Sequence, residues 1–352
     1  MNIAIIGAGG SIGRQIAQMI VSERLIDRSQ HLILVGNKTG QSAKSLLGFA
    51  VDLRDAYAEI CPQIETVFEP EKVWGDVIVM AAGDTITADQ KSGHIDRDML
   101  AKKNIPVFKK YASALAETGH GYEIVICISN PNELSVACFA DYLGRKRVIG
   151  MGAFLDSWRF RKEIAKDLGI HRQKIHGFMV GEHGLNMVPL WSSIHIYSYS
   201  EEKLRTELSR IRKGFKTGNY HQDCARVRTK VHQLLMKGQI NEAYTLIAGY
   251  PPDIRTSLTP MITQLSGSKT VIGTAKATLA LLQMIVLGSD ALVTGQIKLE
   301  GDFHGIHSTI GAPFVIGNKG VDRIIELPLL EEEKKLLIQT AENVNKKLEL
   351  LI

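Results

Sequence analysis

Ile3-Ala4-Ile5-Ile6-Gly7-Ala8-Gly9-Gly10-Ser11-Ile12-Gly13-Arg14 is the stretch that decides the fold. Its apolar run predicts a buried strand, its glycines predict a tight turn, and the amphipathic residues that follow predict a helix. Glycines let the backbone approach a pyrophosphate, which then lies at a helix N-terminus, where free N–H groups favour negative charge. In this context, the spacing Gly7-x-x-Gly10-x-x-Gly13 predicts a dinucleotide site. A plain strand-to-helix turn is the alternative.

A second apolar run, at 31–35, bears on the choice of coenzyme. It ends where an NAD site usually places an acidic residue on the ribose hydroxyls. The chain has Asn37 and Lys38 there, and no carboxylate until Asp52. Because the missing acid removes the repulsion against a 2′-phosphate, which Lys38, Asn37 and Ser42 would bind, we expect NADP to be favoured over NAD. The alternative is an exposed lysine beside an unusual NAD pocket.

The composition narrows the class of protein. A chain of 352 residues suffices for two domains, and 45% hydrophobic with 22% charged residues is typical of a globular protein. The net charge of +5 is spread along the chain, which favours an anionic small substrate and gives no sign of nucleic-acid or membrane binding. The four cysteines lack metal-ligand spacing, so we expect no metal. They read as reduced thiols, and the sequence shows neither a signal-peptide layout nor an apolar stretch long enough to span a membrane, so we expect a cytoplasmic protein.

Strands and helices alternate up to about Gly150, which is typical of a doubly wound parallel sheet. The expected strands are 2–6, 31–35, 76–80, 123–128 and 147–149. The pattern is more mixed afterwards, and the stretch at about 217–265 is the least readable part of the chain.

Two turns are expected at the carboxyl edge of that sheet, where open α/β sheets bind ligands. One strand leads into a turn at Gly83 and a polar loop, Asp84 to His94, with Arg97 at the start of the next helix. Closure of this loop would exclude water and bring Arg97 to the reacting carbonyl. Another strand leads into Ser129-Asn130-Pro131, where the Asn130 side chain would point toward the nicotinamide and the substrate.

Two segments near the middle of the chain supply groups suited to removing a hydride and a proton from an alcohol. Asp156 and Arg159 lie on a predicted helix, and His183 follows in Gly181-Glu182-His183-Gly184. Histidine titrates near neutrality, a buried carboxylate on its second nitrogen fixes its tautomer, and arginine binds a carboxylate with two parallel hydrogen bonds. A surface histidine and a solvated i,i+3 ion pair are the alternatives. The catalytic interpretation of Asp156, Arg159 and His183 is favoured because the N-terminal stretch independently predicts a redox cofactor.

Taken in order, these motifs resemble the lactate/malate dehydrogenase family of 2-hydroxy acid dehydrogenases from end to end. The matching landmarks are Gly7-x-x-Gly10-x-x-Gly13, Ser129-Asn130-Pro131, Leu155-Asp156-x-x-Arg159-Phe160, Gly181-Glu182-His183-Gly184 and Gly311-Ala312-Pro313-Phe314. The resemblance implies an α/β fold, with an N-terminal Rossmann doubly wound parallel sheet over 1–150 and a C-terminal α+β substrate domain with an antiparallel sheet over 151–352.

The resemblance also implies a role for each matching residue. His183 would be the general acid/base and Asp156 its orienting carboxylate, while Arg159 would hold the substrate's 2-carboxylate. Arg97 would polarise the carbonyl, and Asn130 would bridge substrate and cofactor. The expected cofactor-binding residues are Gly7, Gly10, Ser11, Ile12, Gly13, Asn37, Lys38, Gly83 and Asn130. The implied reaction interconverts a 2-hydroxy acid and a 2-oxo acid, in a homodimer or homotetramer.

Departures from the family pattern concern the substrate. Malate enzymes carry an arginine six residues before the carbonyl-polarising one, where this chain has Lys91, and Gln90 beside it is the residue type of lactate enzymes. Lys91 and His94 would engage a distal anion as point charges, and a surface lysine is the alternative. We therefore expect a malate-like or other doubly anionic acid. A lactate-type enzyme for monocarboxylic acids and a catalytically silent coenzyme-binding relative stay open, and an NAD-dependent glycosidase is disfavoured because no cysteine lies beside His183 or Asn130.

Overall fold

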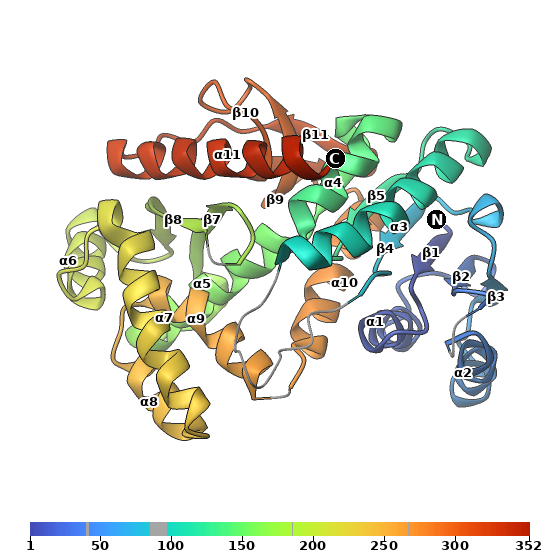
Figure 1. The fold of residues 1–352 in the computed structure, drawn as a ribbon, viewed down its shortest axis with the longest axis horizontal. Helices are drawn as coiled ribbons and strands as arrows, with labels where there is room; N and C mark the ends of the chain where they lie inside the picture. The colour runs from blue at the N-terminus through green and yellow to red at the C-terminus, as the bar shows by residue number, and fades with distance from the viewer. Residues whose placement is uncertain (40–41, 85–96, 185, 267) are drawn as a thin grey trace.

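The structure, a computed structural model, describes residues 1–39, 42–84, 97–184, 186–266 and 268–352. The first part alternates strands and helices (Figure 1): β1 (Ile3–Ile6), α1 (Ser11–Ser22), β2 (His31–Val35), α2 (Ser42–Ala56), β3 (Gln63–Val67), β4 (Val77–Met80), α3 (Arg97–Thr118), β5 (Ile124–Cys127), α4 (Asn132–Leu143) and β6 (Val148–Gly150). These six strands pair in parallel in the order β3-β2-β1-β4-β5-β6. This is the strand order of doubly wound dinucleotide-binding folds, with the topological switch between β1 and β4.

The second part holds five more strands and most of the remaining helices. Its elements are α5 (Gly152–Leu168), β7 (Ile175–Gly181), β8 (Met187–Ile196), α6 (Glu201–Arg212), α7 (Tyr220–Met236), α8 (Ile240–Ala248), α9 (Pro252–Leu265), α10 (Val271–Leu287), β9 (Ala291–Glu300), β10 (His307–Gly317), β11 (Gly320–Ile324) and α11 (Glu331–Leu351). Short 3-10 turns lie at Pro70–Lys72, Arg145–Arg147, Arg172–Lys174 and Thr217–Asn219. The strands are antiparallel and extend the sheet as β6-β9-β10-β7-β8, with β11 on β10.

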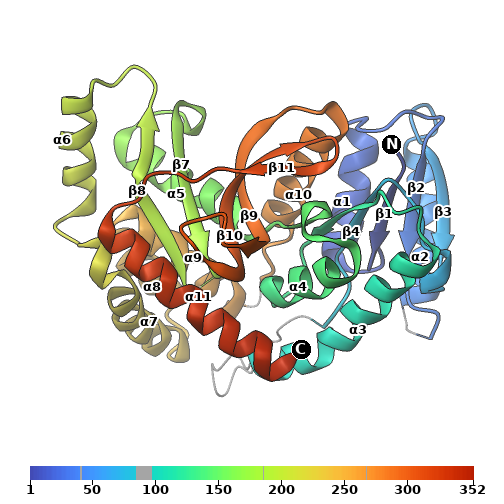
Figure 2. The ribbon, with the colours of Figure 1, turned by 90° about the horizontal axis from the view of Figure 1, so that it is seen from above.

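Helices cover both faces of the parallel part, as its sequence requires. Every residue of β1 is buried, and alternate side chains enter opposite layers: Ile3 and Ile5 one core, Ala4 and Ile6 the other. In Figure 2, α1 and α10 lie on one side of these strands, and α3 and α4 on the other. α1 packs against α10, and a partly exposed ion pair between Lys276 Nζ and Glu23 Oε1 (2.6 Å) lies at this contact, so a late helix covers the first βα unit.

The structure confirms the expected α/β fold, and the five expected strands form within a residue or two of their expected ends. The strand β3 was missed because Ile64 is its only buried residue, as befits the edge of the sheet. The sheet runs across Gly150, and the division into two domains there stays a prediction. Within the described ranges, no helix is long and apolar enough to cross a membrane.

Candidate active site

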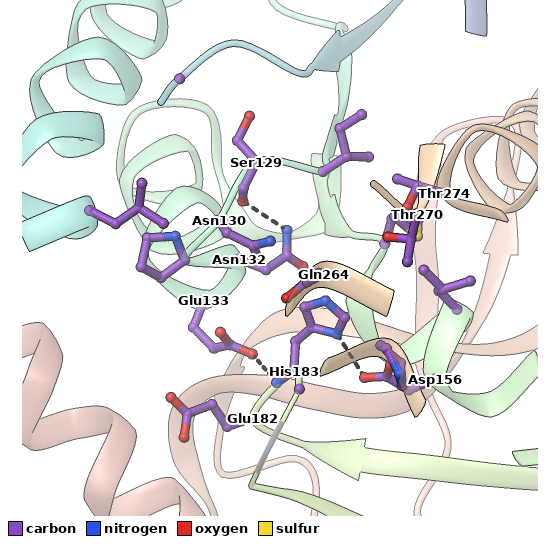
Figure 3. Close-up of a pocket in the computed structure, with 18 of the residues that line it drawn as sticks. Ser129, Asn130, Asn132, Glu133, Asp156, Glu182, His183, Gln264, Thr270 and Thr274 are labelled. Carbon is purple, nitrogen blue, oxygen red and sulfur yellow. Dashed lines mark hydrogen bonds and ion pairs between the residues drawn. The ribbon is translucent and has the colours of Figure 1, made fainter. Parts of the chain in front are cut away.

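A cavity of about 440 Å³ lies at the carboxyl edge of the parallel strands. Its walls come from the ends of β4 and β5, from α5, from the turn after β7, from the α9–α10 segment and from α11. Figure 3 shows the polar side chains that these elements bring together around His183. The place matches the general rule that open α/β sheets bind ligands at this edge, next to the topological switch.

The structure brings His183 and Asp156 into direct contact. The Nδ1 atom of His183 lies 2.7 Å from Oδ2 of Asp156, whose carboxylate is 1% exposed at the start of α5. An ionised carboxylate only accepts hydrogen bonds, so the proton belongs on Nδ1, and Nε2 is left free to exchange a proton with a ligand. This is the orientation that a general acid/base requires.

The charges around His183 favour its imidazolium form. Burial works against the charged ring, but the contact with Asp156 and the more remote charge of Glu133 outweigh it, so the pKa of His183 is raised above its ordinary value. Arg159 opposes the increase without cancelling it. His183 therefore holds a proton at neutral pH more readily than a free histidine, which suits the reduction of a carbonyl.

Arg159 lies one turn after Asp156 and lines the cavity. One nitrogen, Nη1, donates to Asp156 Oδ1 at 3.3 Å. Burial lowers the pKa of the guanidinium, and the charge of Asp156 opposes this. Because the guanidinium has five N–H donors, this bond leaves donors for a carboxylate in the cavity. The geometry fits the expected grip on a 2-carboxylate.

Glu133, at the start of α4, is a neighbour of the histidine that sequence reasoning missed. Its Oε1 accepts the backbone N–H of His183 at 2.7 Å, and its side chain is buried. Burial together with the nearby Glu182 carboxylate raises the pKa of Glu133 to about 7. The signal in the sequence was its position three residues after Asn130, on a turn already expected to face the ligand.

Gly152 allows the histidine to reach this position. A Cβ atom built on Gly152 would lie 2.5 Å from Cγ of the His183 ring, so only glycine fits under it. The backbone N–H of Gly152 is in turn held by Asn132 Oδ1 (3.2 Å), whose amide group donates to the Cys127 carbonyl (2.9 Å). The imidazole therefore packs against the backbone of Gly152, which Asn132 links to the end of β5.

The turn that carries Asn130 is tied to its neighbours. The side chain of Asn104, on α3, donates to the Asn130 carbonyl (2.8 Å) and accepts the N–H of Asp84 (2.7 Å). Ser129 Oγ donates to the Ala82 carbonyl at 2.7 Å. Asn130 and Gly83 both line the cavity, as expected for residues between cofactor and substrate.

The β1–α1 turn fits a pyrophosphate. Gly7 has φ +88°, and a Cβ on Gly13 would clash with the Gly7 carbonyl, so two of the three glycines let the turn pack closely. Gly10 is exposed at the N-cap of α1, and no side chain caps the helix. The first-turn N–H groups at Ser11, Ile12 and Gly13 have no intrahelical acceptors and are the donors that the diphosphate of a nicotinamide coenzyme would take.

The expected 2′-phosphate site has a feature that the sequence did not reveal. Lys38 follows β2 as expected, but its Nζ lies 3.2 Å from Oε1 of Glu69, which follows β3. Lys38 and Lys72 lower the pKa of the half-buried Glu69 carboxyl. The carboxylate of Glu69 therefore lies near the end of β2, although it comes from the segment that follows the neighbouring strand β3. Asn37 shares this turn and accepts the Thr39 N–H (3.3 Å).

Two expected contributors are not placed. Lys91, with the rest of the loop at 85–96, lies outside the described residues. Arg97 begins α3, and its side chain also lies outside what the structure describes. Among the residues that are described, no group of three or more His, Cys, Asp or Glu side chains is arranged to hold a metal ion.

The unreadable stretch at 217–265 forms α7, α8 and α9, and α9 is a wall of the cavity. Arg255, which is 4% exposed, donates to Glu163 Oε2 (2.7 Å) and pairs with Asp167 Oδ1 (2.8 Å), both on α5. Trp191 Nε1 donates to Asp253 Oδ2 at 2.9 Å. The bonds of Arg255 hold α9 on α5, the helix that carries Asp156, and the bond of Asp253 holds it on β8. Among the polar residues of the cavity wall that sequence reasoning missed are Gln264, Lys269 and Lys347.

The fold is that of a dinucleotide-binding protein, and its cavity pairs a histidine with a buried carboxylate. Residues 1–150 match the family described as lactate/malate dehydrogenase, NAD binding domain. Together with the curated relatives, this match supports the lactate/malate dehydrogenase family for the chain.

Curated relatives match along nearly the whole chain. An L-2-hydroxycarboxylate dehydrogenase (NAD(P)(+)) of Methanocaldococcus jannaschii is 27% identical, over 98% of this chain and 97% of its own length. A malate dehydrogenase of Sorangium cellulosum is also 27% identical, over 97% and 95%. An L-lactate dehydrogenase of Latilactobacillus sakei is 26% identical, over 84% and 80%. Relatives of comparable similarity thus carry both malate and lactate names.

Solved structures share the fold. The lactate dehydrogenase of Cryptosporidium parvum, complexed with lactic acid and nicotinamide adenine dinucleotide, superposes with a TM-score of 0.76 at 23% identity and covers 99% of this chain and 97% of its own. The malate dehydrogenase of Aeropyrum pernix gives 0.75 at 23% identity and covers 100% and 98%.

Proposed function

We propose that the protein is an NAD(P)-dependent 2-hydroxy acid dehydrogenase that favours NADP and a malate-like or other doubly anionic acid. The observation that carries the reaction class is the 2.7 Å contact between His183 and Asp156, in a cavity bounded by the nucleotide-binding edge of the sheet. The match to the lactate/malate dehydrogenase family supports it.

The residues would divide the work as follows. A bound nicotinamide supplies the acceptor or donor of the hydride. Arg159 holds the 2-carboxylate of the substrate, and the free Nε2 of His183 takes the hydroxyl proton during oxidation or returns it during reduction. Asp156 stabilises the imidazolium that forms. Asn130, at the β5–α4 turn, orients substrate and nicotinamide toward each other.

A panel of 2-oxo acids tests the reaction class. We expect oxidation of the reduced coenzyme with oxaloacetate or with a sulfo or phosphono analogue, and slower turnover of pyruvate. Faster turnover of pyruvate would assign the lactate-type alternative. Saturable coenzyme binding with no turnover of any acid would identify a silent coenzyme-binding relative.

The coenzyme preference depends on the pair Lys38 and Glu69. Lys38→Ala is expected to weaken NADPH binding about 10- to 100-fold, the value of a charge-assisted hydrogen bond, with little change for NADH. Glu69→Gln frees Lys38 and is expected to tighten NADPH binding. A large loss of NADH affinity in Glu69→Gln would instead make Glu69 a ligand of the ribose hydroxyls and NAD the preferred coenzyme.

We also propose a homodimer or homotetramer in the cytoplasm. Exposed apolar side chains on α2 and α10 support an association between copies: Leu47 and Val51 are about half exposed, and Ile272 is 70% exposed. Light scattering of the purified protein tests it, and a monomer at micromolar concentration would contradict it.

A further inference from the structure

The cations of the cavity wall are not equivalent. Arg159, Lys269 and Lys347 are the lysines and arginines that line the described part of the cavity. Arg159 is paired with Asp156 at 3.3 Å, and Lys347, on α11, is paired with Glu182 at 2.5 Å. Lys269 has neither a hydrogen bond nor an ion pair with any residue that the structure describes. Of these three cations, Lys269 is the one without an acidic partner among the described residues, so its full charge faces a ligand.

The acidic residues of the wall make the position of Lys269 significant. Figure 3 shows Glu133 and Glu182 on one side of His183, and Thr270 and Thr274 on the other. Lys269 directly precedes Thr270, at the start of α10. A second anionic group directed toward Glu133 and Glu182 would find no unpaired cation among the described residues there, because Lys347 is already paired with Glu182, whereas one directed toward the start of α10 would meet the ammonium group of Lys269.

The fixed position of Arg159 sets the direction of the substrate. When the guanidinium holds the 2-carboxylate and His183 faces C2, the rest of the acid must extend along the remaining wall of the cavity. Gln264, at the end of α9, also lines the cavity and is labelled in Figure 3. An amide and an ammonium group together provide donors for an anionic end of the substrate.

We propose that Lys269 selects 2-oxo and 2-hydroxy acids with a second anionic group, by binding that group while Arg159 binds the 2-carboxylate. The inference rests on the proposed function and names the residue that sets its substrate class. Since an ammonium group is a point charge with three donors, it accepts a carboxylate, a sulfonate or a phosphonate without the planar fit that arginine demands. Lys269 would thus hold the distal anion whether or not Lys91 reaches it.

The test compares two acids in three proteins with saturating NADPH. We expect Lys269→Met to lower kcat/KM for oxaloacetate about 10- to 100-fold, the value of one charge-assisted hydrogen bond, and to leave kcat/KM for pyruvate unchanged. Lys269→Arg keeps the charge and is expected to retain most of the preference for oxaloacetate. Lys237→Met, at an exposed lysine in the α7–α8 turn that does not line the cavity, is the matched control for charge and should change neither value.

The outcomes separate the inference from the proposed function. The first outcome concerns a Lys269→Met protein that unfolds at the wild-type temperature. If its kcat/KM falls equally for both acids, or for neither, the role of Lys269 is overturned and the proposed dehydrogenase function is unaffected. A wild-type protein that binds NADPH and turns over neither acid would overturn the proposed function, and the role of Lys269 with it. A Lys269→Arg protein as poor with oxaloacetate as Lys269→Met would show that shape, not charge, matters at this position.

Discussion

The β1–α1 turn and α9 both border the ligand-binding edge of the sheet, but their contacts reach very different distances along the chain. Gly13 packs against the carbonyl of Gly7, six positions before it, and the whole phosphate-binding turn is contained in one short stretch. The α9 helix is held by Arg255 to Glu163, 92 positions away, and by Asp253 to Trp191, 62 positions away. The comparison teaches that a sequence reveals the coenzyme half of such a site more readily than the substrate half.

The largest expected effect is a loss of kcat on substitution of His183, which lies between the coenzyme half and the substrate half of the site. His183→Asn removes the proton-exchanging nitrogen, and we expect kcat to fall by about 10²- to 10⁴-fold because general acid–base catalysis contributes that much. The affinity for NADPH, measured by fluorescence titration, should stay near the wild-type value. Retained turnover, or a parallel loss of coenzyme affinity, would contradict the assignment of His183 to proton transfer.

Arg255→Ala tests whether the long-range contacts hold the substrate half together. The change leaves the buried Glu163 carboxylate without its buried partner, and breaking such a pair costs about 3–5 kcal/mol in the free energy of unfolding. Urea denaturation measures it. Arg210→Ala, which removes a half-exposed i,i+3 pair with Glu207, is the control and should cost less than about 1 kcal/mol. Equal effects would mean that α9 does not depend on this anchor.

Gly152→Ala sharpens the comparison because it changes the site without removing a polar group. The added methyl group would push the His183 ring away, and a displacement of about 1 Å can cost 10²-fold in kcat. Gly48→Ala is the control, because nothing lies within 4 Å of a Cβ at this position in α2, and it should raise stability by about 0.4–1 kcal/mol with unchanged kcat. Full activity in Gly152→Ala would show that the ring tolerates displacement.

The smallest expected effect is a shift of a pH profile. Glu133→Gln keeps an acceptor for the His183 N–H but removes a charge that favours the imidazolium, so the pKa of His183 should fall. Carbonyl reduction needs the imidazolium and declines as pH rises through that pKa, so the decline in kcat/KM should move to lower pH in the variant. The difference should be largest above pH of about 7, where Glu133 is ionised. A decline at the wild-type pH or above it would contradict this electrostatic role.

Sequence reasoning succeeded where the information is local. The apolar runs of β1, β2, β4 and β5 predict a parallel sheet, because the strands of such a sheet are buried on both faces. The structure also brings Asp156 and His183 together, and their roles stay predictions. Their chemistry suggested the pairing of these two residues, which lie 27 positions apart, and the family resemblance added their roles.

What the sequence could not reveal depends on contacts between distant segments. Glu69 was missed because an acid was sought along the chain after β2, and this one reaches Lys38 from the end of β3, 31 positions away. Lys347 and Lys269 were missed because nothing local shows that α11 and the start of α10 border the cavity. Which lysine is neutralised and which is available follows only from the position of Glu182.

One isotope experiment tests the central claim most directly, namely that the protein moves a hydride from C2 of a hydroxy acid to a nicotinamide coenzyme. The protein is incubated with NADP⁺ and with malate or lactate deuterated at C2, and the reduced coenzyme is analysed by mass spectrometry. The account predicts one deuterium in the reduced coenzyme, with malate as the faster donor. Reduced coenzyme without deuterium, or none at all from a protein that binds NADP⁺, would contradict it.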